Sequence, residues 1–131
     1  MTIFESTVQI NQPVSQVYSF LNDLNNHQKL MPENIYNWSS TTDEAQFTIQ
    51  NMAKLALKVS SRLEDEEINI VPSQEAPFAI EMKWNVTSEN EGTKATLKVS
   101  ADLNMMMKML ASGPLQKLVD HQTSALAKTL A

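Results

Sequence analysis

The sequence predicts one α+β domain, residues 1–131, in which an antiparallel sheet of about seven strands packs one face against helices. Three observations predict this class. An amphipathic helical pattern runs from Pro114 to Ala131, apolar and polar residues alternate along most of the chain before it, and most connections are too short for a parallel crossover. Helices that cover a single side of the sheet explain why each strand has one apolar and one polar face.

The C-terminal helix is predicted to be the element around which the sheet is organised. Gly113 and Pro114 mark its start, because proline fits the first helical turn, where its missing N–H would have no partner anyway. At about 1.5 Å per residue the helix would span roughly 26 Å, so its apolar side needs a broad apolar partner. That side carries Leu115, Leu118, Val119, Gln122, Leu126, Thr129 and Leu130.

The first part of the chain is predicted to form a strand and two short helices. Thr2 to Ile10 alternates with period two, as a half-buried strand does. Apolar residues then recur at helical spacing from Val14 to Leu24. A second helical turn is predicted over His27 to Met31, and Pro32 stops it.

Six further strands are predicted from period-two alternation. The clearest alternation places Leu55, Leu57, Val59, Ser61 and Leu63 on one face. The segment from Met105 to Leu110 is expected to connect the last strand to the long helix. The six predicted strands cover residues 35–39, 45–50, 54–64, 68–71, 78–87 and 95–103.

Composition disfavours several function classes. The net charge is −5, so the chain lacks the basic field that nucleic acid or an anionic membrane would require. It has no cysteine for a disulfide or a thiolate and only two glycines, too few for a phosphate-binding loop. No apolar run approaches the roughly 20 residues that span a bilayer. No secretion signal is evident, so the expected location is the cytoplasm.

The order of elements and a few local patterns resemble the START-like superfamily, also called SRPBCC proteins. This superfamily includes birch-pollen-allergen-like and polyketide cyclase or dehydrase-like proteins. The resemblance implies a helix-grip fold, in which a curved sheet wraps the C-terminal helix around an apolar cavity that binds lipids, quinones or polyketides. The chain departs from the plant-allergen branch, which carries a glycine-rich loop between early strands. The matching turn here, from Thr42 to Glu44, is short and has no glycine, so no phosphate-contacting role is assigned to it. The local patterns are Pro13, Val14, Val17, Tyr18, Phe20 and Leu21, then Leu30 to Pro32, then Gly92 to Lys94, then the helix from Leu115 to Leu130.

The predicted interior is almost wholly apolar. Acid or base catalysis would need an inward titratable group, and the strand alternation places Arg62, Glu81 and the other charged strand residues on the solvent face. No catalytic residue is therefore predicted. An apolar ligand held by one or two hydrogen bonds suits such an interior better. The candidate cavity residues are Tyr36, Trp38, Phe47, Leu57, Val59, Ser61, Met82, Trp84, Leu97, Met109, Leu118 and Gln122.

Three features have both a functional and a plain structural interpretation. Gln122 lies within an apolar stripe, so its amide needs a partner, either a ligand or a neighbouring group or water. The methionine-rich run from Met105 to Met109 suits either an adaptable cavity mouth or adaptable packing. His27 and His121 lie on distant elements with no ligand-spaced partners, so no metal site or cofactor is predicted.

The leading functional hypothesis is non-catalytic binding of a hydrophobic or amphipathic small molecule in a cavity between the sheet and the C-terminal helix. One alternative is an enzyme of the cyclase or dehydratase kind, which an inward Asp, Glu, Arg or His would favour. A second is a partner-binding module that resembles the chaperone-ATPase activators of the superfamily. A solidly packed interior with an exposed apolar patch would favour this module. Oligomeric state is left open.

Overall fold

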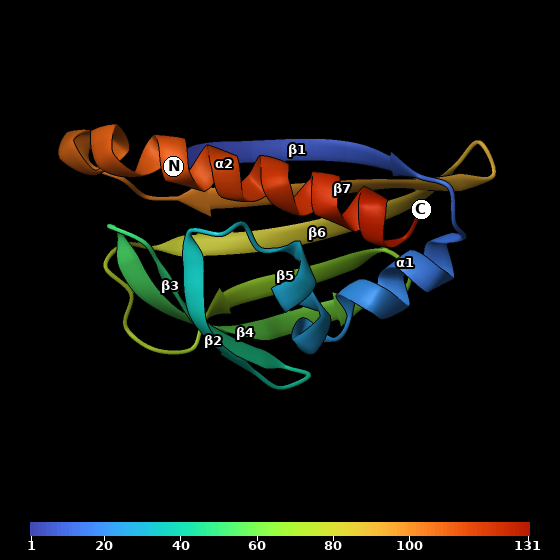
Figure 1. Ribbon diagram of the computed structural model, residues 1–131, viewed down its shortest axis with the longest axis horizontal. Helices are drawn as coiled ribbons and strands as arrows, with labels where there is room; N and C mark the ends of the chain where they lie inside the picture. The colour runs from blue at the N-terminus through green and yellow to red at the C-terminus, as the bar shows by residue number, and fades with distance from the viewer.

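The computed structural model describes residues 1–131 and confirms the α+β class (Figure 1). One curved antiparallel sheet of seven strands carries the long C-terminal helix on its concave side, with two short helices between the first two strands. In chain order the elements are β1 (Thr2–Ile10), α1 (Val14–Leu21), η1 (a 3₁₀ helix, Leu24–Leu30), β2 (Ile35–Ser40), β3 (Glu44–Ile49), β4 (Ala53–Leu63), β5 (Glu67–Pro72), β6 (Ile80–Glu89), β7 (Gly92–Ala101) and α2 (Met105–Thr129).

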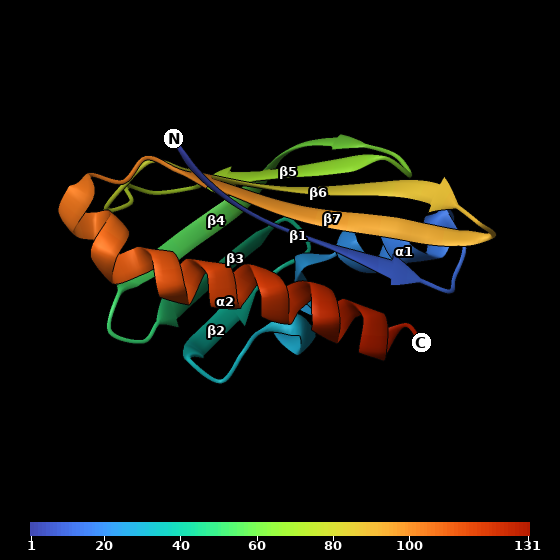
Figure 2. The ribbon, with the colours of Figure 1, turned by 90° about the horizontal axis from the view of Figure 1, so that it is seen from above.

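The sheet is a meander from β2 to β7, and β1 pairs with β7 at the far edge, giving the order β1-β7-β6-β5-β4-β3-β2. β1 and β7 pair along their whole length, from Thr2 opposite Ala101 to Ile10 opposite Thr93. Figure 2 shows how the sheet curls, so that β2, β3 and β4 turn down beside α2 while β1 and β7 lie along it. The helix and the curled sheet together enclose one contiguous apolar core.

The C-terminal helix begins earlier than the sequence predicted. Met105 starts it, and the side chain of Asn104 caps it by accepting a hydrogen bond from the Met107 N–H at 2.8 Å. The segment expected to be a connector is therefore its first turns, and Pro114 lies inside the helix. A proline there removes one intrahelical hydrogen bond and bends the helix. Figure 2 shows the first turns inclined to the rest.

Beyond Pro114 the helix buries the predicted side as far as Leu126, whereas Thr129 is exposed and Leu130 is half-buried, because they lie at the end of the helix. Leu115, Leu118, Val119, Gln122 and Leu126 are all buried. Helical spacing places these residues toward the sheet, as the sequence indicated. Two further contacts fix the helix on either side: the Thr123 hydroxyl lies 2.7 Å from that of Ser6 on β1, and His121 Nδ1–H donates to the Leu30 carbonyl at the end of η1, at 3.0 Å.

Two β-bulges reverse the predicted faces of β2 and β4. Asn37 adopts a left-handed conformation (φ 56°), and the pairing of β2 shifts there, so Tyr36 lies on the outer face while Trp38 points inward. In β4 the pairing shifts between Val59 and Ser61. The sequence predicted that both aromatic residues of β2 share one face. They do not, because the extra residue of a bulge exchanges the faces of all residues after it.

The bulge in β4 also changes the environment of its last residues. Ser61 and Leu63 were predicted to face inward and are exposed instead. Arg62 pairs with the buried Ile68 of β5, so Arg62 starts from the concave face, although the sequence predicted the solvent face. Its guanidinium then reaches the elements that cover that face.

The short helices end differently from the prediction. α1 ends at Leu21, whereas the sequence predicted an end near Asn25 and Asn26, and a separate 3₁₀ helix follows. The Asp23 carboxylate starts η1 by accepting a hydrogen bond from the Asn25 N–H at 3.0 Å. This cap takes the chain out of the α-helix and turns Leu24, His27 and Leu30 into the interior. None of the helices combines the length and the apolar character that crossing a bilayer requires.

Candidate functional site

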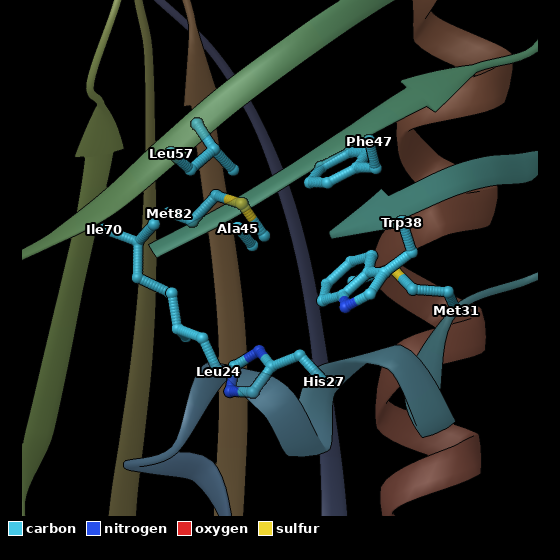
Figure 3. Close-up of a pocket in the computed structure, with 9 residues that line it drawn as sticks. All are labelled: Leu24, His27, Met31, Trp38, Ala45, Phe47, Leu57, Ile70 and Met82. Atoms are coloured by element: carbon cyan, nitrogen blue, oxygen red, sulfur yellow. The ribbon is translucent and has the colours of Figure 1, made fainter. Parts of the chain in front are cut away.

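A small apolar cavity lies between η1 and the concave face of β2 to β6 (Figure 3). It holds about 20 Å³ of space that the centre of a water-sized sphere can occupy. No residue of α2 lines it, whereas the sequence predicted a cavity between the sheet and this helix. The reason is that Leu115, Leu118 and Leu126 fill the concave face beneath α2. The lining consists of Leu24, His27, Met31, Trp38, Ala45, Phe47, Leu57, Ile70 and Met82.

The cavity floor follows from strand register. Ala45 on β3 lies opposite Leu57 on β4, and Ile70 on β5 lies opposite Met82 on β6. Directly paired residues point to the same face, so these four side chains form a continuous apolar floor.

One wall of the cavity is a pair of stacked aromatic rings. Trp38 and Phe47 have ring centroids 5.4 Å apart and an interplanar angle of 13°. The indole is held in place, because its Nε1–H donates to the Ser40 hydroxyl at 2.9 Å and that hydroxyl donates to Asn25 Oδ1 at 2.7 Å. The wall is therefore rigid and joined to η1, and its indole N–H is already committed.

His27 is the one polar residue in the lining. Its Nε2 lies 2.8 Å from the Leu21 carbonyl, and since a carbonyl cannot donate, Nε2 carries the hydrogen. The ring also meets Trp84 edge to face, with centroids 6.5 Å apart. Burial lowers the pKa of His27, against the opposing effects of the Leu21 hydrogen bond and the Asp23 charge. The imidazole is thus a buried, neutral group at neutral pH.

Contacts from both sides hold η1 over the cavity. At its start, the Leu24 N–H donates to the Thr42 carbonyl at 3.0 Å. Arg62 donates to the carbonyl and side-chain oxygens of Asn22 and, at 2.7 Å, to the Asp43 carboxylate. At its end, His121 contacts the Leu30 carbonyl. A 3₁₀ helix has weaker internal hydrogen bonds than an α-helix, so these outside contacts determine how firmly η1 covers the cavity.

The predicted cavity residues separate into three groups. Trp38, Phe47, Leu57 and Met82 line the cavity together. Trp84, Leu97, Leu118 and Gln122 are buried outside its lining, and Val59 is half-buried. Tyr36, Ser61 and Met109 were expected inside but are exposed, the first two because of the bulges and Met109 because it lies on the first turns of α2.

Sequence reasoning missed five of the nine lining residues. Ala45 lies on a face that was correctly assigned with Phe47, and its position in the strand could have identified it. No face was assigned to the short strand of Ile70, although Ile68 and Ile70 share one by alternation. Leu24 and His27 lie on a 3₁₀ helix, and Met31 follows its last residue. The three-residue spacing of Leu24, His27 and Leu30 is its period, but two turns make a weak signal in the sequence. The Asp23 cap before it is the local signal that a new element begins there.

Gln122 keeps the feature that drew attention in the sequence. Its side chain has no exposed surface, and neither amide atom has a hydrogen-bond partner in the protein. The indole N–H of Trp84 is likewise buried and unpaired. Neither residue lines the cavity, so the ligand contact considered for Gln122 stays a prediction.

The chemistry open to the cavity follows from its single imidazole. The sequence predicted no inward histidine, and His27 corrects that expectation. A neutral imidazole can accept a hydrogen bond or a proton. No other titratable residue lies among the nine that line the cavity. An inward histidine is a feature that was expected to favour the enzyme alternative, and a lone imidazole can both take up and return a proton.

Comparison with known proteins identifies the fold alone. No family profile matches this sequence, and no curated protein sequence matches it. Solved structures do match over nearly the whole chain. KanY is 15% identical with a TM-score of 0.82, covering 98% of this chain and 97% of its own. TTHA0849 from Thermus thermophilus is 14% identical with a TM-score of 0.79 and the same coverage. The Aha1 dimer from Colwellia psychrerythraea is 13% identical with a TM-score of 0.69, covering 99% of this chain and 96% of its own.

Proposed function

We propose that the protein binds a small apolar molecule in the cavity beneath η1. The observation that carries this proposal is the lining, in which eight apolar side chains surround one buried neutral imidazole. Such a surface offers an apolar molecule a large area and at most one hydrogen bond. The proposed role is binding or carriage without chemistry, and the ligand class includes lipids, quinones and polyketide-like molecules.

The size of the cavity requires that it widen on binding. About 20 Å³ accommodates roughly one water-sized group, far below the 300 Å³ or more of usual ligand pockets. Met31 and Met82 line it with flexible, unbranched side chains that can change rotamer to make room. Outward movement of η1 would have to break its hydrogen bonds to Thr42 and His121 and partly expose its buried side chains, so side-chain rearrangement is the smaller change.

We also propose membership of the START-like superfamily. The support is the order of elements, in which a strand, two short helices, a meander and a long C-terminal helix follow one another. The similarity to KanY and TTHA0849 along nearly their whole length agrees with this order.

Native mass spectrometry of the freshly purified protein tests the binding proposal, with solvent extraction to identify any bound compound. We expect a discrete added mass. Ala45→Val should remove it, because two extra methyl groups on the cavity floor occupy the available space. Ala56→Val is the matched control, since Ala56 lies on the outer face of neighbouring β4. An unliganded mass, with no saturable binding of a fluorescent apolar probe, would contradict the proposal.

A second candidate function is association through an exposed apolar surface at the start of α2. The methionine patch, defined as Met105, Met106, Met109 and Leu110, is 82%, 71%, 83% and 66% exposed. Contiguous exposed apolar side chains mark interaction surfaces. The nearly filled interior agrees with this role, and one structural neighbour, Aha1, was solved as a dimer.

Sedimentation velocity over a range of concentrations tests self-association first. The Met106→Glu/Met109→Glu variant should remain monomeric where the parent protein dimerises. Lys117→Glu, on an exposed position further along α2, is the control for added negative charge. A parent protein that stays monomeric at all concentrations would contradict self-association through the methionine patch.

A further inference from the structure

The hydrogen-bonding state of His27 restricts what the cavity can accept. Nε2 carries its hydrogen and donates it to the Leu21 carbonyl. In a neutral imidazole the other nitrogen, Nδ1, then has a free lone pair and no hydrogen. Burial lowers the pKa of the ring and so keeps it in this neutral form. The cavity therefore has a hydrogen-bond acceptor at this point, and not a donor.

No protein group satisfies this acceptor. The only hydrogen bond of the His27 side chain is the one to Leu21, and the eight other lining residues are apolar. The indole N–H of Trp38 is used by Ser40. Figure 3 shows one ring nitrogen of His27 turned toward the space between Met82 and Trp38. Because this nitrogen has no partner within the protein, a molecule that brings a donor to it gains a hydrogen bond and therefore affinity.

The walls favour a flat molecule. Trp38 and Phe47 stack within 13° of parallel and present a planar apolar surface. Met31 and Met82 complete the space with thioethers, which make favourable contacts with aromatic rings. Since the present volume holds about one water-sized group, the rearrangement that admits a ligand is smallest for a single ring.

We propose that the cavity selects small planar aromatic molecules that carry a hydroxyl or N–H group, and that Nδ1 of His27 accepts the hydrogen bond from that group. This inference rests on the proposed binding function and narrows its ligand class to phenol-like members, so that quinones, which carry only carbonyl acceptors, fall outside it. Molecules of the same shape that carry only an acceptor, such as an ether or carbonyl oxygen, place a lone pair against the lone pair of Nδ1 and are rejected.

The test compares phenol with toluene, its near-isostere without a donor, and with anisole, which has only an acceptor. Dissociation constants are measured for the parent protein and for His27→Phe, which keeps a ring and removes the acceptor. We expect phenol to lose about tenfold in affinity in the variant, the equivalent of about 1.4 kcal/mol, while toluene changes by less than about threefold. Taking the ratio of the dissociation constants of phenol and toluene cancels the general effects of altered packing, which both ligands experience.

A measurement on the parent protein covers the possibility that His27→Phe does not fold. With ¹⁵N-labelled histidine, phenol should shift the resonance of the unprotonated Nδ1 of His27, whereas saturating toluene should leave it close to its free value. His121 is the internal control, because its Nδ1 already donates to the Leu30 carbonyl.

The outcomes separate the two proposals. The inference about His27 is overturned, while the binding function stands, if three results occur together. Toluene and phenol both bind, the ratio of their dissociation constants is the same in the variant as in the parent protein, and the Nδ1 resonance does not respond to phenol. If none of the three molecules binds, both proposals fail for ligands of this size. Preferential phenol binding that is lost with His27 supports both.

Discussion

The buried amide of Gln122 gives the sharpest test of how the interior is held together. The side chain has no exposed surface, and both its oxygen and its nitrogen lack a partner in the protein. Leaving such a group unpaired costs about 1 to 3 kcal/mol. Gln122→Met keeps an unbranched side chain of similar length and removes both polar atoms. We therefore expect the variant to be more stable by about 1 to 3 kcal/mol.

Urea denaturation measures this difference directly, provided that the m-value is unchanged. For a chain of 131 residues, each kcal/mol corresponds to a shift in Tm of about 3 to 5 °C. Leu126→Met is the control on the same buried side of α2, and it should lose less than about 1.5 kcal/mol. If Gln122→Met were destabilised by about 1 kcal/mol or more, the amide would have a partner, such as an ordered water, and the reasoning would be wrong.

Three other predictions concern particular residues. A Cβ on Gly92 would lie 2.5 Å from the Ile10 carbonyl oxygen, whereas one on Gly113 would meet nothing within 4 Å. Urea denaturation should show Gly92→Ala destabilised by about 1 to 3 kcal/mol and Gly113→Ala stabilised by about 0.5 to 1 kcal/mol; shifts of the same sign would contradict this. Asn104→Ala removes the cap of α2 and should lower the local opening free energy of its first turns by about 1 kcal/mol, seen as faster amide exchange there, with unchanged exchange as the contrary result. Burial lowers the pKa of His27, so below about pH 6.5 the unfolded chain binds a proton that the folded chain does not. The free energy of unfolding should fall by up to about 1.4 kcal/mol per pH unit as the pH drops, and His27→Gln should lose this component; parallel pH profiles would refute it.

The fold was predictable because its strands and its last helix have strong apolar periods. Thr2 to Ile10 alternates with Ile3 as its one exception, and the helical stripe after Pro114 is buried as expected as far as Leu126. The predicted start of α2 was wrong because Gly113 and Pro114 resemble a boundary. Met105 to Leu110 are instead good helix formers with a cap before them, and they continue the helix despite the hydrogen bond that Pro114 removes.

The candidate site was less predictable because it depends on features without a period. A bulge adds one residue, and neither Ser60 nor Asn37 stands out in a polar strand position. Asn37 carries a weak signal, since asparagine tolerates the left-handed conformation that it adopts there. The three-residue spacing of Leu24, His27 and Leu30 is the one weak local signal that His27 faces the interior. Its burial follows from the tertiary position of η1, which local sequence does not specify.

The break at Pro114 divides one continuous helix into two units of different cooperativity. Before it, Ala111 is the single buried residue, and after it every turn up to Leu126 contributes to the core. Amide hydrogens of the first turns should therefore exchange through local openings, while those around Val119 exchange only when the whole protein unfolds. The methionine patch consequently lies on a segment that can fray and refold against a partner without loosening the sheet, the cavity or the rest of α2.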